Sequence, residues 1–557
     1  MTTFHSTRST TDSLTSKQAI RKGIADDGGL FVTDSLGETH VDIASLAGKS
    51  YQQIAFDVLS VLLPDYTEAE LKECIDEAYG PQWSDEKITP VKPLGDDYVM
   101  ELFNGPTSAF KDVALQILPR FMARTTPADG DADEKIMIVT ATSGDTGKAA
   151  LAGFADAPGT GITVFYPEGK VSRVQNLQMS TQEGDNVAVC GIRGNFDDAQ
   201  SAVKRIFADK ELVERLEAAG TVLSSANSIN VGRLVPQVVY YFAAYAQLLR
   251  AGAIEAGDAV EFCVPTGNFG DILAGYYAKR MGLPVAKLIV ASDKNNVLAD
   301  FLTTGVYDRN RPFFTTISPS MDILISSNLE RMLYFLSDGD CELVAGLMEQ
   351  LAQTGRYEVP AELLAKIQCV FGCGWASEDE VRTAIKSCWD ANGYVIDPHT
   401  ACGYHVFEKV APTEGAKVRV LLSTASPYKF PRACCDALGL TDVRCVHARA
   451  EEFSVAQREN YDIAVSRAVA NLRLLSELCL PLVKVGGQFL AMKSAGSDAE
   501  IDEAGKAIAL LGGKLAAVRD YPIPGTEVTH RLVVIEKVSP TPKRYPRPFA
   551  KIKKAPL

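Results

Sequence analysis

The sequence predicts an α/β protein with open sheets, because apolar runs are followed three times by a loop rich in glycine or hydroxyl groups and then by the start of a helix. The three units lie at residues 138–150, 259–275 and 418–431. Glycines let successive backbone N–H groups converge, and the helix adds the positive end of its dipole at the same point. The first two loops are candidate anion sites and the third offers a hydroxyl at a strand end, although capped helices and ordinary turns have similar sequences.

Length and composition predict more than one domain. The chain has 557 residues, 46% of them hydrophobic, and a single core seldom grows beyond about 250–300 residues. We therefore expect at least three domains. No apolar run approaches the ~18 residues that span a bilayer, and residues 1–22 lack the apolar region of a signal peptide. These features predict a cytoplasmic protein with no membrane partner, and the net charge of −14 argues against general nucleic-acid binding by the whole chain.

The twelve cysteines predict reduced thiols and no structural metal. Cys434 and Cys435 are adjacent. The spacing of Cys369 and Cys373 is the one most similar to a metal-binding pair. None of the six histidines stands at a ligand spacing beside them.

Lys111 is the first candidate for chemistry. The segment 103–112 presents it behind a Gly-Pro turn and two hydroxyl residues, Thr107 and Ser108. A lysine that holds a Schiff base needs a fixed stem and a partly desolvated amine, and upstream hydroxyls can bind a substrate carboxylate. A lone lysine after a turn is more often a solvated surface charge, so the remaining motifs decide between the two interpretations.

Three further loops fit an anionic ligand with a ring. The glycine loop 267–271 is suited to a phosphate group, and the loop 142–147 could hold a second anion. The hydroxyl of Thr424, after the apolar strand expected at 418–422, could meet a ring nitrogen.

In this order and at these separations, the motifs resemble threonine synthase, a pyridoxal-phosphate enzyme of fold type II, the tryptophan-synthase-β type. They are Gly-Pro-Thr-Ser-Ala-Phe-Lys-Asp at 105–112, Thr-Ser-Gly-Asp-Thr-Gly at 142–147, Gly-Asn-Phe-Gly-Asp at 267–271 and Thr-Ala-Ser-Pro at 424–427. The resemblance extends over residues 1–437. It implies an N-terminal domain at 1–90 and catalytic domains with two open sheets at 91–440.

The resemblance also implies roles for individual residues, with Lys111 as the catalytic lysine and pyridoxal 5'-phosphate as the cofactor. The implied cofactor-binding residues are Phe110, Gly267, Asn268, Phe269, Gly270, Asp271 and Thr424. The implied substrate-binding residues are Thr107, Ser108, Ser143, Gly144, Asp145, Thr146, Asn227, Ser228, Asn230 and Arg233. Arg233 is suited to phosphate by its bidentate fork.

The implied reaction converts O-phospho-L-homoserine and water to L-threonine and phosphate, by γ-elimination and then β-hydration. The freed amine of Lys111 would move protons at Cα and Cβ of the substrate. The neutral hydroxyl of Thr424 would leave the pyridine nitrogen largely unprotonated.

The last part of the chain, residues 441–557, resembles a different family. Ala-Arg-Ala-Glu-Glu at 448–452, Ser-Arg-Ala-Val at 466–469, Leu-Pro-Leu-Val-Lys-Val-Gly-Gly at 480–487 and the closing Pro-Lys-Arg-Tyr-Pro-Arg at 542–547 are similar to the C-terminal half of the 16S ribosomal RNA guanine-N7 methyltransferase, the glucose-inhibited division protein B family. A partial Rossmann-like half-domain is implied. The glycine-rich loop and the acidic residue that bind S-adenosylmethionine in such enzymes are not in this chain, so that cofactor is not expected.

Local patterns in this segment predict a strand and then an acidic turn at 441–453, a buried strand leading to a helix at 461–470, and a Gly-Gly turn before a strand that ends near residue 493. Strands at 463–466 and 489–492 expect a parallel neighbour from the missing half, and an unpaired edge favours aggregation. The tail 540–557 is basic and without acids, which predicts a disordered tail more than an RNA-binding one.

The chain is therefore interpreted as a chimera of a nearly complete threonine synthase and half a methyltransferase. The alternatives are a methyltransferase-related or RNA-binding protein led by the C-terminal half, another fold type II lyase such as threonine dehydratase, and an inactive chain. The dehydratase pattern places its lysine in a Ser-x-Lys-x-Arg setting, whereas Lys111 follows Ala-Phe.

Overall fold

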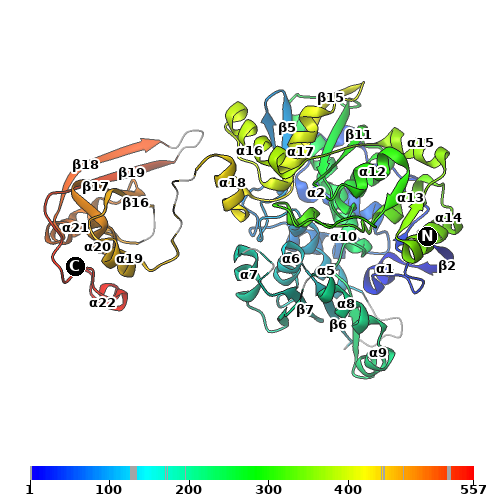
Figure 1. Ribbon diagram of the computed structural model, residues 1–557, viewed down its shortest axis with the longest axis horizontal. Coiled ribbons are helices and arrows are strands. Elements are labelled where there is room, and N and C mark those ends of the chain that lie inside the picture. The colour runs from blue at the N-terminus through cyan, green and yellow to red at the C-terminus, as the bar shows by residue number, and fades with distance from the viewer. Residues whose placement is uncertain are drawn as a thin grey trace. The chain divides into compact units, whose positions relative to one another are not determined.

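The chain forms two compact units in the computed structural model, Met1–Thr441 and Asp442–Leu557, each with its own hydrophobic core (Figure 1). The structure describes residues 3–125, 134–142, 144–169, 171, 173–194, 196–440, 442, 444, 446–467, 470–522 and 528–557. Among the described helices, none is both long and apolar enough to cross a membrane.

The N-terminal segment packs into the core of the first unit. Its three-stranded antiparallel sheet has the order β2-β1-β3, and capping boxes at Thr15, Ser50 and Thr67 begin three of its helices. The elements are β1 Phe4–Ser6, β2 Ser9–Leu14, α1 Ser16–Lys22, β3 Phe31–Val32, η1 Ile43–Gly48, α2 Tyr51–Leu62 and α3 Glu68–Ala78. Buried residues from Phe4 to Leu422 share one hydrophobic cluster.

A six-stranded sheet forms the centre of the first unit, with the order β14-β11-β10-β15-β5-β4. All neighbours are parallel except β4 and β5. The strands are β4 Val91–Leu94, β5 Asp97–Glu101, β10 Ala259–Pro265, β11 Val285–Ser292, β14 Phe371–Trp375 and β15 Ala416–Ser423. Because β5, β15 and β10 are adjacent and parallel, the loops after all three leave the same edge of the sheet.

A parallel four-stranded sheet, with the order β8-β7-β6-β9, forms the second layer. Figure 1 shows it with α6 to α9 below the larger sheet. Its elements are β6 Lys135–Ala141, α6 Asp145–Phe154, β7 Thr160–Pro167, α7 Arg173–Ser180, β8 Val187–Ile192, α8 Phe196–Ala208, α9 Lys210–Glu217 and β9 Thr221–Ser224. The family resemblance implied two open sheets, and the structure confirms them.

Helices complete the first unit. The longest is α10, Val231–Arg250, which is buried along most of its length. The others are α4 Lys111–Leu115, α5 Leu118–Ala123, α11 Gly270–Arg280, α12 Val297–Thr304, α13 Leu329–Leu336, α14 Cys341–Thr354, α15 Ala361–Val370, α16 Glu378–Asn392, α17 Pro398–Lys409 and α18 Pro431–Ala437. Short elements are β12 Val306–Asp308, η2 Pro319–Met321, β13 Arg356–Glu358 and η3 Pro427–Lys429.

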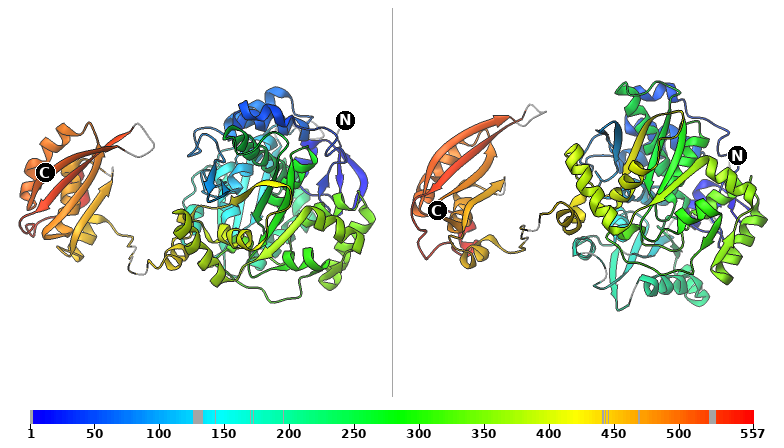
Figure 2. Two further views of the ribbon diagram at one scale, coloured as in Figure 1. Left: turned by 90° about the horizontal axis from the view of Figure 1, so that it is seen from above. Right: turned by 45° about the horizontal axis from the view of Figure 1, so that its top comes forward.

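The C-terminal unit is a four-stranded mixed sheet with the order β16-β17-β19-β18, and β16 and β17 are its parallel pair. Figure 2 shows this sheet as one curved layer. Its elements are α19 Ala450–Ala456, β16 Tyr461–Arg467, α20 Leu472–Cys479, η4 Leu480–Leu482, β17 Val483–Ser494, α21 Asp498–Leu510, β18 Gly513–Pro522, β19 Thr529–Lys537 and α22 Phe549–Lys554.

Four expectations for this unit need correction. The described residues of 442–449 form no strand, and α19 occupies the place of the acidic turn. The Gly-Gly pair lies inside β17 as an irregularity, not in a turn before it. The segment 489–492 is paired on both sides, by β16 and β19. The strand at 461–467 is mostly exposed, because its outward face has no covering layer within the unit.

The basic tail is also ordered, contrary to the prediction. Arg547 makes two charge-assisted bonds of 2.8 and 2.6 Å to the buried carboxylate of Glu477. Arg458 donates to the carbonyl oxygens of Thr541, Pro542 and Tyr545. Buried Tyr545 and Ile552 add apolar contacts, so burial and pairing outweigh the repulsion among the tail's cations.

Candidate active site

Lys111 begins α4, directly after the loop that follows β5. Thr107 closes this loop: its backbone N–H and its hydroxyl donate to the two oxygens of the Asp112 carboxylate, at 2.8 and 2.6 Å. Gly105 is needed here because a Cβ would come within 2.6 Å of Asp112. Ser108 has φ +58°, an uncommon left-handed conformation that completes the turn. The result is a lysine with a fixed stem.

The amine of Lys111 is poised between its two protonation states. Burial lowers the pKa of Lys111 to about 8, Arg233 and Lys429 push in the same direction, and Asp145 and Asp271 oppose them. The amine lies 4.4 Å from the centre of the Phe110 ring. A pKa near 8 leaves a useful fraction of the amine neutral near pH 7, which a nucleophile or a base requires.

Lys429 is a charged residue of the site to which sequence reasoning assigned no role. Its ammonium lies 2.6 Å from Asp145 Oδ1 and donates to the carbonyl oxygen of Thr107 at 2.9 Å. Burial opposes ionisation of Asp145, but Lys429 and Lys111 outweigh it and hold the pKa of this carboxyl well below its usual range. The signal that could have found Lys429 is a lone charge in the otherwise uncharged segment 423–431.

Asp145 links the two sheets. It begins α6, after β6 of the four-stranded sheet, whereas Lys429 ends η3, after β15 of the six-stranded sheet. Asp145 also accepts bonds from Gln175 Nε2 at 3.1 Å and from Ser320 Oγ at 3.3 Å. The Asp145 carboxylate is thus bound by side chains that follow strands of both sheets.

The glycine loop after β10 has the shape of an anion cradle. Phe269 has φ +64° and is fully buried, and α11 begins at the next residue. A Cβ on Gly267 would come within 2.9 Å of the Ser320 carbonyl oxygen. Asn268 is exposed, and its carbonyl oxygen accepts the backbone N–H of Asn328 at 3.1 Å. The loop therefore presents its backbone at a helix N-terminus.

Two ionisable side chains lie buried behind this loop. Burial raises the pKa of Asp271 to about 6, against the effect of a backbone N–H bond from Ile272 and of Lys111. Burial lowers the pKa of Arg233 to about 10, against the attraction of Asp271. Arg233 Nη1 donates to the Ala226 carbonyl oxygen at 2.9 Å. The electrostatic interactions thus join Lys111, Asp145, Asp271, Arg233 and Lys429 in one site.

The loop between β6 and α6 is held by Thr142, whose hydroxyl accepts the backbone N–H groups of Gly144 and Gly147 at 3.0 and 2.9 Å. Gly144 has φ +142°, and a Cβ there would overlap Gln175. Thr146 is half-buried. Ser143, also predicted as a substrate-binding residue, lies outside the described residues.

The four polar residues predicted between 227 and 233 have different surroundings. Asn227 Oδ1 accepts the Thr140 hydroxyl at 2.9 Å, and the Ser228 hydroxyl is 3.5 Å from that of Ser327. Asn230 is fully buried and caps α10, with its amide donating to the carbonyl oxygens of Ile20 and Ser225. Both amide N–H groups of Asn230 are therefore used in hydrogen bonds to the protein backbone and are not available to a substrate.

Thr424 lies beside Lys111, because its carbonyl oxygen accepts the Phe110 N–H at 2.8 Å. Behind it is a buried network that the sequence did not reveal. Asp397 accepts bonds from the ring of His399 at 2.6 Å, and the backbone N–H of Ser320 donates to His399 Nε2 at 3.1 Å. Because Nε2 accepts, the proton of a neutral His399 ring is on Nδ1.

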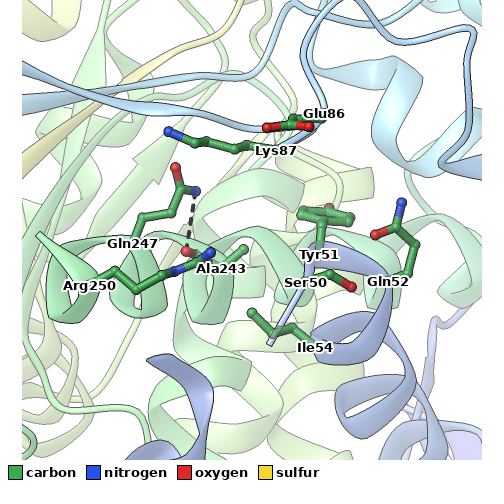
Figure 3. Close-up of a pocket in the computed structure, with 9 residues that line it drawn as sticks. All are labelled: Ser50, Tyr51, Gln52, Ile54, Glu86, Lys87, Ala243, Gln247 and Arg250. Atoms are coloured by element: carbon green, nitrogen blue, oxygen red, sulfur yellow. Dashed lines mark hydrogen bonds between the residues drawn. The ribbon is translucent and has the colours of Figure 1, made fainter. Parts of the chain in front are cut away.

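The pocket in Figure 3 is separate from this site. It has a volume of about 390 Å³ and lies between the start of α2, the 86–87 turn and α10. Its lining residues are Ser50, Tyr51, Gln52, Ile54, Glu86, Lys87, Ala243, Gln247 and Arg250. The Gln247 amide is already engaged, donating to the carbonyl oxygens of Thr89 and Ala243 and accepting the Val91 N–H. None of the predicted site residues lines it.

Within the described ranges, no group of three or more histidine, cysteine or acidic side chains is placed to hold a metal ion. The described cysteines are all free thiols.

Three family models match the chain. Residues 3–79 match the threonine synthase N terminus, residues 95–346 match the pyridoxal-phosphate dependent enzymes, and residues 413–524 match rRNA small subunit methyltransferase G. The third match begins inside the first unit, where residues 416–423 form β15 of the six-stranded sheet.

Curated relatives match the first unit. Human threonine synthase-like 1 is 41% identical over 443 residues, which are 76% of this chain and 58% of the relative. Threonine synthase of Pseudomonas aeruginosa is 38% identical over 77% of this chain and 89% of the relative. The chain thus spans less than two thirds of the threonine synthase-like 1 proteins and most of the bacterial enzyme.

Solved structures agree with this match. The threonine synthase of Brucella melitensis, solved with bound PLP, superposes with a TM-score of 0.73 at 40% identity, over 79% of this chain and 92% of that chain. The yeast enzyme gives a TM-score of 0.72 at 34% identity, over 80% and 91%.

Proposed function

This chain belongs to the threonine synthase family, and we propose that it converts O-phospho-L-homoserine and water to L-threonine and phosphate with pyridoxal phosphate as its cofactor. The observation that carries the proposal is the placement of Lys111, a fixed and partly desolvated amine between the glycine loop 267–271 and Thr424. We expect the enzyme to act in the cytoplasm.

The residues present fit the cofactor. The backbone of Gly267 to Gly270 at the start of α11 is suited to its phosphate group, and the hydroxyl of Thr424 is suited to a ring nitrogen that stays largely unprotonated. Lys111 offers an amine with a pKa of about 8, as attachment to an aldehyde requires. When bound, pyridoxal phosphate supplies an electron sink for carbanion chemistry.

Lys111 carries the proton transfers. Once its amine is free, it would remove a proton from the substrate Cα and one from Cβ, so that the phosphate leaves from Cγ. It would then return protons at Cγ and Cα, while the hydroxyl of water adds at Cβ and the remaining proton of water ends on the released phosphate. The pKa near 8 places both protonation states within reach at neutral pH. The ion pair of Asp145 and Lys429 keeps both of these side chains charged beside Lys111.

Cationic and hydroxyl groups around Lys111 suit a doubly anionic substrate. Arg233 brings a guanidinium to the site, and Ser108 and the loop 144–146 bring hydroxyl and backbone groups, whereas the hydroxyl of Thr107, predicted to bind substrate, is buried and already donates to Asp112. We assign the substrate's carboxylate and phosphate to these two sets of groups.

The test is release of phosphate and threonine from O-phospho-L-homoserine by the purified chain with added pyridoxal phosphate. We expect equal amounts of the two products. Lys111→Ala should lose at least about 100-fold in rate, since a positioned acid–base group contributes 10²–10⁴-fold. Lys210→Ala, which removes an exposed lysine at the start of α9, is the matched control and should keep full activity.

Phosphate release without threonine would contradict the hydration step. Equal turnover by Lys111→Ala and the parent chain would contradict the assignment of Lys111.

A further inference from the structure

One edge of β16 lacks a neighbouring strand in the part of the chain that the structure describes, since β17 pairs with its other edge. The same strand carries three apolar side chains that are largely exposed, Tyr461 at 37%, Ile463 at 54% and Val465 at 58%. The residues between them point to the other face, where Ser466 is buried and Ala464 half-buried. An open edge with an apolar face is a template for a further strand.

The opposite edge of the sheet, β18, also lacks a neighbouring strand among the described residues, but it carries three charged residues where β16 carries two. It carries the charged residues Lys514, Arg519 and Asp520, and its register shifts between Leu515 and Ala517. Charges and bulges are the devices that keep an edge strand from pairing. An antiparallel pairing of β16 with its own copy has two-fold symmetry, so an assembly through this edge ends at two copies.

We propose that β16 pairs antiparallel with β16 of a second copy of this chain, so that the two sheets form one continuous sheet in a two-fold dimer. The sequence Tyr-Asp-Ile-Ala-Val-Ser-Arg of 461–467 is compatible with this pairing when Ala464 lies on the axis. Ile463 then faces Val465 of the other copy, Asp462 faces Ser466, and Tyr461 faces Arg467.

The charges of the strand support the antiparallel direction. In this register Asp462 faces the hydroxyl of Ser466 of the other copy, which allows a hydrogen bond. Arg467 faces the ring of Tyr461 of the other copy, which allows a cation–π contact. An in-register parallel pair would place Asp462 opposite Asp462 and Arg467 opposite Arg467, and like charges directly opposite are destabilising. Lys484, which pairs with Asp462 at 3.2 Å inside the unit, would offset only the first of these repulsions.

Sedimentation velocity of the full chain at micromolar concentration tests the interface. The parent chain should be a dimer and Val465→Lys a monomer, because the new ammonium would face Ile463 of the other copy. Val518→Lys is the matched control, since Val518 is a 42% exposed valine on β18, and this variant should remain a dimer. A monomeric parent, a dimer that survives Val465→Lys, or loss of the dimer in Val518→Lys would each overturn the proposal.

The register has its own test at Tyr461, which would face Arg467 of the other copy. Tyr461→Glu and Tyr461→Lys both remove the ring, but only the lysine puts a like charge opposite Arg467. Because the two-fold axis makes this contact twice, the dimer dissociation constant should be about two- to thirtyfold higher for the lysine variant than for the glutamate variant, from the range measured for single cross-strand pairs. Equal dissociation constants, or a weaker glutamate variant, would overturn the antiparallel register.

Discussion

At the scale of single residues, the site depends on how four charges share a buried space. Lys111 keeps a lowered pKa because it is desolvated and because Lys429 and Arg233 are near it, while Asp145 pulls the other way. Asp145 in turn is held ionised chiefly by Lys429. Removing one member therefore changes the protonation of the others.

Lys429→Met should raise the pKa of Lys111 above its value of about 8. The variant removes a cation that disfavours protonated Lys111, and it leaves Asp145 with Lys111 as its nearest ammonium. The measurement is the pH dependence of amine labelling at Lys111 in the cofactor-free protein, followed by peptide mass spectrometry. Neutral amine reacts, so labelling should require higher pH than in the parent.

Lys210→Met removes an exposed lysine at the start of α9 and should leave this labelling profile in place. A Lys429→Met profile that moves to lower pH would contradict the electrostatic account.

At the scale of elements, the tail helix α22 and the segment before it are held by one buried ion pair. Glu477 on α20 is fully buried, and Arg547 donates to it from both its side chain and its backbone. The pairing explains why a run of like charges is ordered here. The sequence pattern could show the run but not the carboxylate that meets it.

Arg547→Met should destabilise the C-terminal unit by about 3 kcal/mol, the lower part of the range for an abandoned buried charge, because Arg547 is itself partly exposed. Urea unfolding followed by a probe in the C-terminal unit measures the change. Lys554→Met is the control, because Lys554 belongs to the same tail and has no buried partner among the described contacts. This variant should lower the free energy of unfolding by less than about 0.5 kcal/mol. Equal losses in both variants would argue against the ion pair.

At the scale of the whole molecule, the two units have separate hydrophobic cores. The first unit contains every predicted site residue that the structure describes, and it ends at Thr441. Because its core contains residues from Phe4 to Leu422, we expect the first unit to fold without the second.

Calorimetry should therefore show two unfolding transitions. Pyridoxal phosphate should raise the midpoint of only one of them, since a ligand stabilises the unit that binds it. A chain ending at Thr441 should retain that transition and lose the other. A single transition in the full chain that shifts as a whole with the cofactor would contradict independent units.

The sequence by itself determined the α/β class, the family and the two-part organisation, because these depend on motifs that are contiguous along the chain. The loops at 105–112, 267–271 and 424–427 each carry their glycines, hydroxyls and lysine in order, so their local chemistry was readable. Only the tertiary structure decided which side chains meet. Lys429, Ser320 and His399 join the surroundings of the site because β15, β10 and β5 are adjacent in the sheet and because the four-stranded sheet brings Asp145 to them. The tertiary structure also decided that the tail is ordered and that β16, not β17, is the open edge, since pairing and burial depend on contacts between residues far apart in the chain.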